Sequence, residues 1–152
     1  MDKSYQVGVI GAGSCSSDVY DLALEVGRQI AKNGWTLICG GLGGVMEAAA
    51  RGCAKEGGTT VGILPGLDAS SANPYIRIPI PTGLGEARNA LVVRASDALV
   101  AISGGYGTLS EIAFGLKTGK LVVGLHTWQG IDGVQYVNSP AEAIQLLKDV
   151  LK

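Results

Sequence analysis

The fold is decided near the start of the chain by the stretch Tyr5-Gln6-Val7-Gly8-Val9-Ile10-Gly11-Ala12-Gly13-Ser14. The first six of these residues are rich in β-branched side chains and predict a strand, and the glycines that follow predict a tight turn. From Asp18 to Asn33 the apolar positions recur at helical spacing, and Gly34 suits a C-terminal cap. A strand that turns through glycines into a helix is the first unit of a Rossmann-like α/β fold.

The same alternation of strands and helices continues along the chain. Further strands are predicted at Trp35–Cys39, Thr59–Leu64, Ile76–Ile80, Ala98–Ile102 and Leu121–Leu125. Further helices are predicted at Val45–Glu56 and Gly85–Arg94, before a fourth that ends near Lys117 and a fifth that begins at Ser139-Pro140. Unbroken apolar strands suit a parallel sheet that is covered on both faces. We therefore expect residues 1–152 to form one Rossmann-like, doubly wound α/β domain with a mainly parallel sheet and helices on both faces.

Composition narrows the classes of partner. Only 16% of the residues are charged, against roughly 25% in an average domain, and 47% are hydrophobic. With so few charged residues, part of the protein surface is expected to be apolar, and burial of this surface against another copy of the chain predicts a homo-oligomer. The net charge of −1 argues against a nucleic-acid or anionic-membrane partner, and neither a membrane span nor a leader peptide is predicted. Three widely spaced cysteines (Cys15, Cys39 and Cys53) predict reduced thiols, a cytoplasmic location and no metal site.

Glycine is unusually common, at 24 of 152 residues, and it gathers where strands give way to helices. Three such turns, at residues 11–14, 40–44 and 104–108, follow strands whose carboxyl ends share one edge of a parallel sheet. A helix N-terminus exposes unpaired N–H groups, and glycine lets the backbone approach a phosphate closely. The predicted phosphate-binding residues are Gly11, Gly13, Ser14, Gly40, Gly41, Gly43, Gly44, Gly104, Gly105, Tyr106, Gly107 and Thr108.

The turns do not match the standard dinucleotide or triphosphate patterns. Ser16 stands where the third glycine of the NAD fingerprint would be, and Cys39-Gly40-Gly41 ends the second strand without an acidic residue for the ribose. No glycine-lysine-serine or glycine-lysine-threonine sequence is present. The sequence therefore favours a mononucleotide or another phosphate monoester as the ligand.

Two segments resemble the lysine decarboxylase-like (LOG/SLOG) superfamily: Gly85-Glu86-Ala87-Arg88-Asn89, and Gly104-Gly105-Tyr106-Gly107-Thr108-Leu109-Ser110-Glu111. The second is similar to the GGxGTxxE motif of the LOG phosphoribohydrolases, which release the free base from a nucleoside 5′-monophosphate. The resemblance implies that Arg88 and Glu111 are the catalytic residues, and that the chain is not a genuine lysine decarboxylase.

The order of motifs along the chain looks most like the molybdenum-cofactor carriers of this superfamily. The pieces that carry this resemblance are Gly34-Trp35, the run from Gly40 to Met46, the run from Gly57 to Gly62, Leu64-Pro65-Gly66, and Thr82-Gly83-Leu84-Gly85. The resemblance implies a homodimer or homotetramer that requires no cofactor for its own activity but is able to bind molybdenum cofactor or a nucleotide.

Three positions depart from the LOG pattern: Ser103 replaces a proline, Asn89 a lysine and Ser110 a glutamate. These departures favour binding of a phosphorylated ligand, with LOG-like hydrolysis as the alternative. At the level of sequence, Glu111 either acts on a ligand or caps its own helix through Thr108-Leu109-Ser110-Glu111. Tyr106 either covers a ring of the ligand or packs at an interface, and His126 is expected to be structural.

Overall fold

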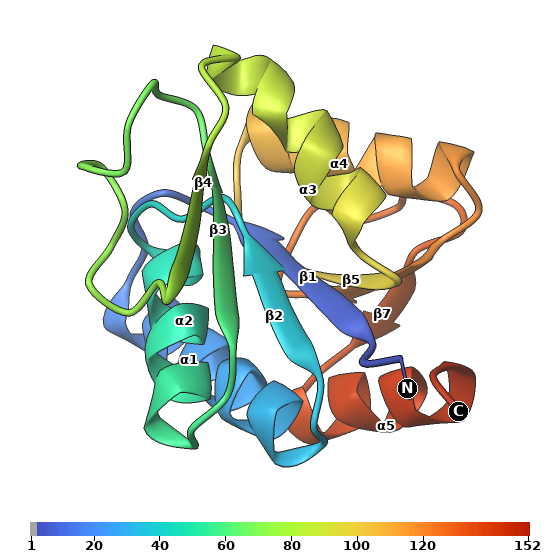
Figure 1. The fold of residues 1–152 in the computed structure, drawn as a ribbon. Helices are drawn as coiled ribbons and strands as arrows, with labels where there is room; N and C mark the ends of the chain where they lie inside the picture. Colours follow the sequence, from blue (N-terminus) through green and yellow to red (C-terminus); the bar gives the residue numbers. More distant parts are fainter. Residues whose placement is uncertain (1–2) are drawn as a thin grey trace.

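A seven-stranded parallel sheet runs through the computed structural model, which describes residues 3–152 (Figure 1). The strand order is β4-β3-β2-β1-β5-β6-β7, and every neighbouring pair is parallel. The strands are β1 (Gln6–Gly11), β2 (Thr36–Cys39), β3 (Thr60–Leu64), β4 (Ile78–Pro81), β5 (Ala98–Ile102), β6 (Leu121–Leu125) and β7 (Gln135–Val137). The helices are α1 (Ser17–Lys32), α2 (Val45–Lys55), α3 (Arg88–Ala95), α4 (Tyr106–Lys117) and α5 (Pro140–Val150). The predicted Rossmann-like α/β architecture is confirmed.

Helices cover both faces of the sheet, with α1, α2 and α5 on one face and α3 and α4 on the other (Figure 1). The inner strand β5, next to the central strand β1, is buried on both faces, since its side chains alternate between two hydrophobic clusters. Val100 and Ile102 join the cluster under α1, α2 and α5, whereas Leu99 and Ala101 join the cluster under α3 and α4. This burial explains the unbroken apolar sequence of the strand.

Some elements differ from the sequence prediction. The helix predicted at Gly85–Arg94 is a short 3-10 turn (Gly85–Ala87) followed by α3. Strand β4 begins two residues later than expected and all four of its residues are exposed. Strand β7 was not predicted. It has only three residues, of which only the last is buried, so its sequence shows no alternation of apolar and polar side chains.

The order of the strands in the sheet determines where the candidate site lies. From β1 it moves outward through β2 and β3 to β4, and it then returns to the other side of β1 to form β5. The neighbours β1 and β5 therefore lead into helices on opposite faces, α1 and α4 (Figure 1). Such a topological switch point leaves a crevice at the carboxyl ends of the strands.

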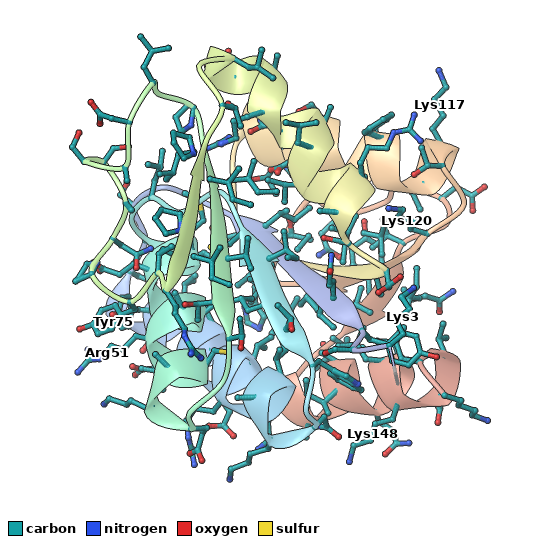
Figure 2. All side chains as sticks on the ribbon, viewed as in Figure 1. Lys3, Arg51, Tyr75, Lys117, Lys120 and Lys148 are labelled. Atoms are coloured by element: carbon teal, nitrogen blue, oxygen red, sulfur yellow. The ribbon has the colours of Figure 1, made fainter. Side chains whose placement is uncertain are left out.

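Long polar side chains lie at the periphery of the molecule in Figure 2, where Lys117 and Lys148 are labelled. Arg51 of α2 lies over the ring of Tyr75, with 5.9 Å between the guanidinium carbon and the ring centroid, and so anchors the loop that precedes β4 (Figure 2). None of the helices in residues 3–152 combines the length and the apolar character needed to cross a membrane.

Candidate functional site

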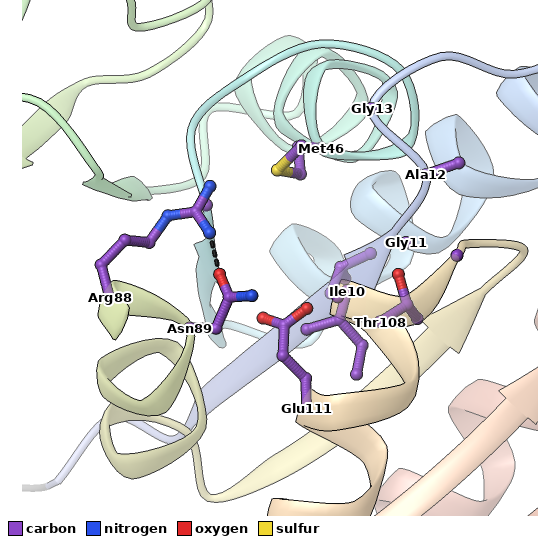
Figure 3. A pocket seen from close by; sticks show the side chains of 13 residues that line it. Ile10, Gly11, Ala12, Gly13, Met46, Arg88, Asn89, Thr108 and Glu111 are labelled. Atoms are coloured by element: carbon purple, nitrogen blue, oxygen red, sulfur yellow. Dashed lines mark hydrogen bonds between the residues drawn. The ribbon is translucent and has the colours of Figure 1, made fainter. Parts of the chain in front are cut away.

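A cavity of about 190 Å³ opens at the switch point between β1 and β5 (Figure 3). Arg88 and Asn89 of α3 and Thr108 and Glu111 of α4 project into it from one side, and Met46 of α2 from another (Figure 3). The remaining lining is mostly backbone and apolar side chain: Val9, Ile10, Gly11, Ala12, Gly13, Gly40, Gly105 and Gly107. Parts of all three glycine turns therefore border one cavity.

The first two turns pack backbone against backbone. The N–H of Val45 donates to the carbonyl of Ala12 at 2.9 Å, which ties the start of α2 to the turn after β1. Gly44 has φ +62°, and a Cβ at this position would overlap the carbonyl of Ala12, so the close approach requires glycine. Here glycine serves packing between the turns, and neither Gly43 nor Gly44 lines the cavity.

Asn73 does not line the cavity, but its hydrogen bonds stabilise the turn after β2. Its side-chain amide donates to the carbonyl of Leu42 at 2.8 Å, and its backbone N–H donates to the carbonyl of Gly41 at 2.8 Å. The residue is buried, and it was not predicted to have a structural role. The asparagine-proline pair at residues 73–74 is a turn signal that could have identified it.

The N-terminus of α4 presents free backbone donors to the cavity. Gly105 is the N-cap and supplies no side-chain cap, and the first helical bond runs from the N–H of Leu109 to the carbonyl of Gly105. The N–H groups of the preceding residues have no partner within the helix, and the helix dipole adds positive potential there. Gly107 and the buried Thr108 line the cavity at this point, and the Thr108 hydroxyl faces into it (Figure 3).

Two adjacent glycines of this turn should respond very differently to substitution. Gly104 has φ +106° and a Cβ there would overlap the Thr108 side chain, whereas Gly105 has no heavy atom within 4 Å of the same position. We expect Gly104→Ala to lower the free energy of unfolding by about 2–4 kcal/mol and Gly105→Ala to change it by less than about 1 kcal/mol. Urea denaturation of the two variants measures both values, and equal losses would contradict this account of the turn.

Arg88 is the first residue of α3, and only 9% of its surface is exposed. Its guanidinium lies against the end of β2, where a Cβ on Gly40 would come within 2.8 Å of the Nη2 atom. Gly40 therefore makes the room that the guanidinium occupies. The Nη1 atom donates to the Asn89 side chain, while the buried Nε atom has no hydrogen-bond partner among residues 3–152. A largely buried cation in the wall of a cavity suits an incoming anion.

Glu111 lies in the second turn of α4 with 9% of its surface exposed. Burial raises the pKa of this carboxyl to about 8, and the nearby positive charge of Arg88 lowers it only in part. The carboxyl is therefore mainly protonated at neutral pH and does not oppose an anion in the cavity. The helix-capping interpretation of Glu111 is wrong, since α4 begins at Tyr106 and its N-cap is Gly105.

The structure divides the residues predicted from the sequence into two groups. Those that line the cavity are Gly11, Gly13, Gly40, Arg88, Gly105, Gly107, Thr108 and Glu111, and those outside its lining are Ser14, Gly41, Gly43, Gly44, Gly104 and Tyr106. Met46 and Asn89 were not predicted as site residues, although each is the last residue of a segment that carries the family resemblance. Within residues 3–152, no three histidine, cysteine or acidic side chains gather in a way that could hold a metal ion.

Comparisons with known proteins identify the family of this chain. The model of the SLOG cluster4 family matches residues 4–149. An uncharacterized protein of Archaeoglobus fulgidus is 48% identical over 142 residues, covering 93% of each chain. A cytokinin riboside 5′-monophosphate phosphoribohydrolase of Mycobacterium tuberculosis is 32% identical over 136 residues, covering 82% of this chain and 71% of that protein.

Two solved structures match nearly the whole chain. The molybdenum cofactor binding protein of Rippkaea orientalis superposes with a TM-score of 0.94 at 35% identity, covering 99% of each chain. The molybdenum cofactor carrier protein of Chlamydomonas reinhardtii superposes with a TM-score of 0.90 at 36% identity, covering 98% of this chain and 99% of that one. The resemblance to the LOG/SLOG superfamily and to its carrier proteins is thereby confirmed.

Proposed function

This chain belongs to the SLOG cluster4 family, and we propose that it binds a phosphate-bearing small ligand in the switch-point cavity and acts as a carrier of molybdenum cofactor. The observation that carries the proposal is Arg88, a largely buried guanidinium that lines the same small cavity as the N-terminal turn of α4. The two groups together offer charge-assisted and backbone donors to one phosphate. Likeness to the cofactor-binding protein of Rippkaea orientalis over the full chain supports the choice of cargo.

Two features favour binding over hydrolysis. A carboxylate that stabilises an oxocarbenium-like ribosyl centre must be ionised, whereas the raised pKa keeps Glu111 mainly neutral at pH 7. Ser103 stands where the LOG pattern has a proline and has φ +56°, a backbone angle that the proline ring forbids. The turn before α4 therefore differs in its backbone from one that holds a proline at this position.

The alternative is a phosphoribohydrolase that releases free base from a nucleoside 5′-monophosphate. The presence of Arg88 and Glu111 in one cavity favours it, as does the similarity to the Mycobacterium tuberculosis enzyme. In this function Arg88 would hold the phosphate or the ribose hydroxyls, and an ionised Glu111 would stabilise the positive charge on the ribosyl carbon.

Incubation of the purified protein with AMP and other nucleoside 5′-monophosphates separates the two functions. We expect saturable binding by calorimetry and no free base by chromatography, with Glu111→Ala as the control. If the wild type releases free base and Glu111→Ala does not, the carrier function is contradicted and the hydrolase function is supported. If neither a nucleoside monophosphate nor a pterin phosphate binds the folded protein, both functions are contradicted.

We further propose that the protein acts as a homodimer or homotetramer in the cytoplasm, without a nucleic-acid partner. Support for an oligomer comes from large apolar side chains that remain exposed on β4 and around α3: Leu67, Ile78, Ile80, Leu84 and Leu91. The three free thiols support a reducing compartment, and the net charge of −1 offers little attraction to a polyanion.

A further inference from the structure

An exposed pair of aromatic rings stands beside the switch-point cavity and has no part in the contacts described so far. Tyr106, the first residue of α4, has 82% of its surface exposed. Its ring centroid lies 5.8 Å from that of Trp128, and the two ring planes are inclined by 34°. An aromatic ring that remains so open beside a cavity is available to a ligand.

The pair is joined to the cavity through a single residue. The indole N–H of Trp128 donates to the carbonyl of Gly105 at 3.0 Å, and Gly105 lines the cavity. Tyr106 follows Gly105 directly, at the helix N-terminus whose free N–H groups suit a phosphate. A ligand whose phosphate lies at this terminus therefore needs to extend only past Gly105 to reach the two rings.

The segment that carries Trp128 is fixed by hydrogen bonds on both sides. The N–H of Ser103 donates to the carbonyl of His126 at 3.0 Å, and the Thr127 hydroxyl donates to the carbonyl of Ser103 at 2.7 Å. The Tyr136 hydroxyl donates to the carbonyl of Trp128. Ser103 and His126 both have left-handed backbones, with φ +56° and +53°. Non-glycine residues adopt this conformation at a cost that the surrounding contacts must offset, and such sites cluster where a ligand is held.

The size of the cavity indicates where the rest of the ligand lies. A space of about 190 Å³ is smaller than the roughly 300–1,000 Å³ of pockets that enclose a whole small molecule. A phosphorylated ligand with a fused ring is therefore expected to extend beyond the cavity. The tilted aromatic pair of Tyr106 and Trp128 lies next to Gly105 in the cavity wall and offers exposed ring faces there.

We propose, resting on the function proposed above, that Tyr106 and Trp128 form a stacking surface for the fused heteroaromatic ring of the phosphorylated ligand. Every purine and pterin ring presents a π-face, so stacking on these side chains adds affinity without reading the ring edge. The arrangement makes Tyr106 the residue that distinguishes ligands bearing such a ring from simple sugar phosphates.

Two probes that share a ribose phosphate test the stacking surface. GMP carries a purine ring and ribose 5-phosphate carries none. We expect Tyr106→Ala to weaken GMP binding by about 5- to 100-fold, the range of a base–aromatic contact. Binding of ribose 5-phosphate should stay within about twofold, and Tyr106→Phe should retain the affinity for GMP. Equal effects of Tyr106→Ala on the two probes, or no effect on GMP, would overturn the stacking surface.

Tryptophan fluorescence gives a second readout, because the chain has only two tryptophans and Trp35 is 8% exposed in the core. GMP should change the emission of the wild type and leave that of Trp128→Phe unchanged, whereas ribose 5-phosphate should change neither. Failure of both probes to bind the wild type would contradict the phosphate site itself. If Tyr106→Ala lowers the oligomeric state and weakens the binding of GMP and ribose 5-phosphate equally, the Tyr106 ring belongs to a subunit contact and not to a stacking surface.

Discussion

Glu111→Gln is expected to raise the free energy of unfolding at about pH 9 by about 2–5 kcal/mol and to change it little at about pH 4. In the folded protein burial raises the pKa of this carboxyl to about 8, against 4.5 for an exposed glutamate. Between these two values the folded state holds a proton that the unfolded state has released. Wild-type stability from this group therefore falls as the pH rises from about 4.5 to about 8 and then levels off, whereas glutamine does not titrate.

Urea denaturation at several pH values measures the difference between wild type and Glu111→Gln. The matched control is Glu86→Gln, which removes an exposed carboxylate from the 3-10 turn beside α3. This control should leave the pH dependence of the wild type in place. Parallel stability curves for the wild type and Glu111→Gln would show that Glu111 is ionised in the folded protein, and the hydrolytic function would then gain support.

The sequence predicted those parts of the fold that depend on local pattern. Strand β5 was readable because all five of its side chains are buried, and a strand covered on both faces is apolar without interruption. The glycine turns were readable because each directly follows such a strand. The start of α5 was equally clear, since the Ser139 side chain accepts from the N–H of Glu142 and proline occupies the first turn.

The same sequence could not separate glycines that border the cavity from glycines that serve packing. Gly40 makes room for a guanidinium 48 positions away in the chain, whereas Gly44 allows two turns to touch. Both roles depend on contacts between distant segments, which no local pattern records. For the same reason the pairing of Tyr106 with Trp128 could not be predicted, although Tyr106 had been considered as a residue that covers a ring of the ligand.

Arg88→Met is expected to weaken binding of nucleoside monophosphates and of ribose 5-phosphate by about 100-fold, or about 3 kcal/mol, at 25 °C. The variant removes a buried cation whose donors would reach the phosphate, so ligands with and without a ring should lose affinity alike. This common loss distinguishes Arg88 from Tyr106, whose removal should affect only the ligand with the ring. Calorimetric titration of both probes measures the two patterns.

Arg94→Met is the matched control, because it removes the same charge from the same helix at the end remote from Arg88. Arg94 is exposed, and its guanidinium lies over the ring of Phe114 with 5.0 Å between the guanidinium carbon and the ring centroid. Its removal should change phosphate binding by less than about twofold, since an exposed charge is screened by water and salt. Methionine in place of Arg88 also replaces a charged group that is costly to bury with an apolar chain of similar length, so the folded state should not lose stability. If Arg88→Met is stably folded and still binds both probes like the wild type, the phosphate does not lie at Arg88, and only the N-terminus of α4 remains to hold it.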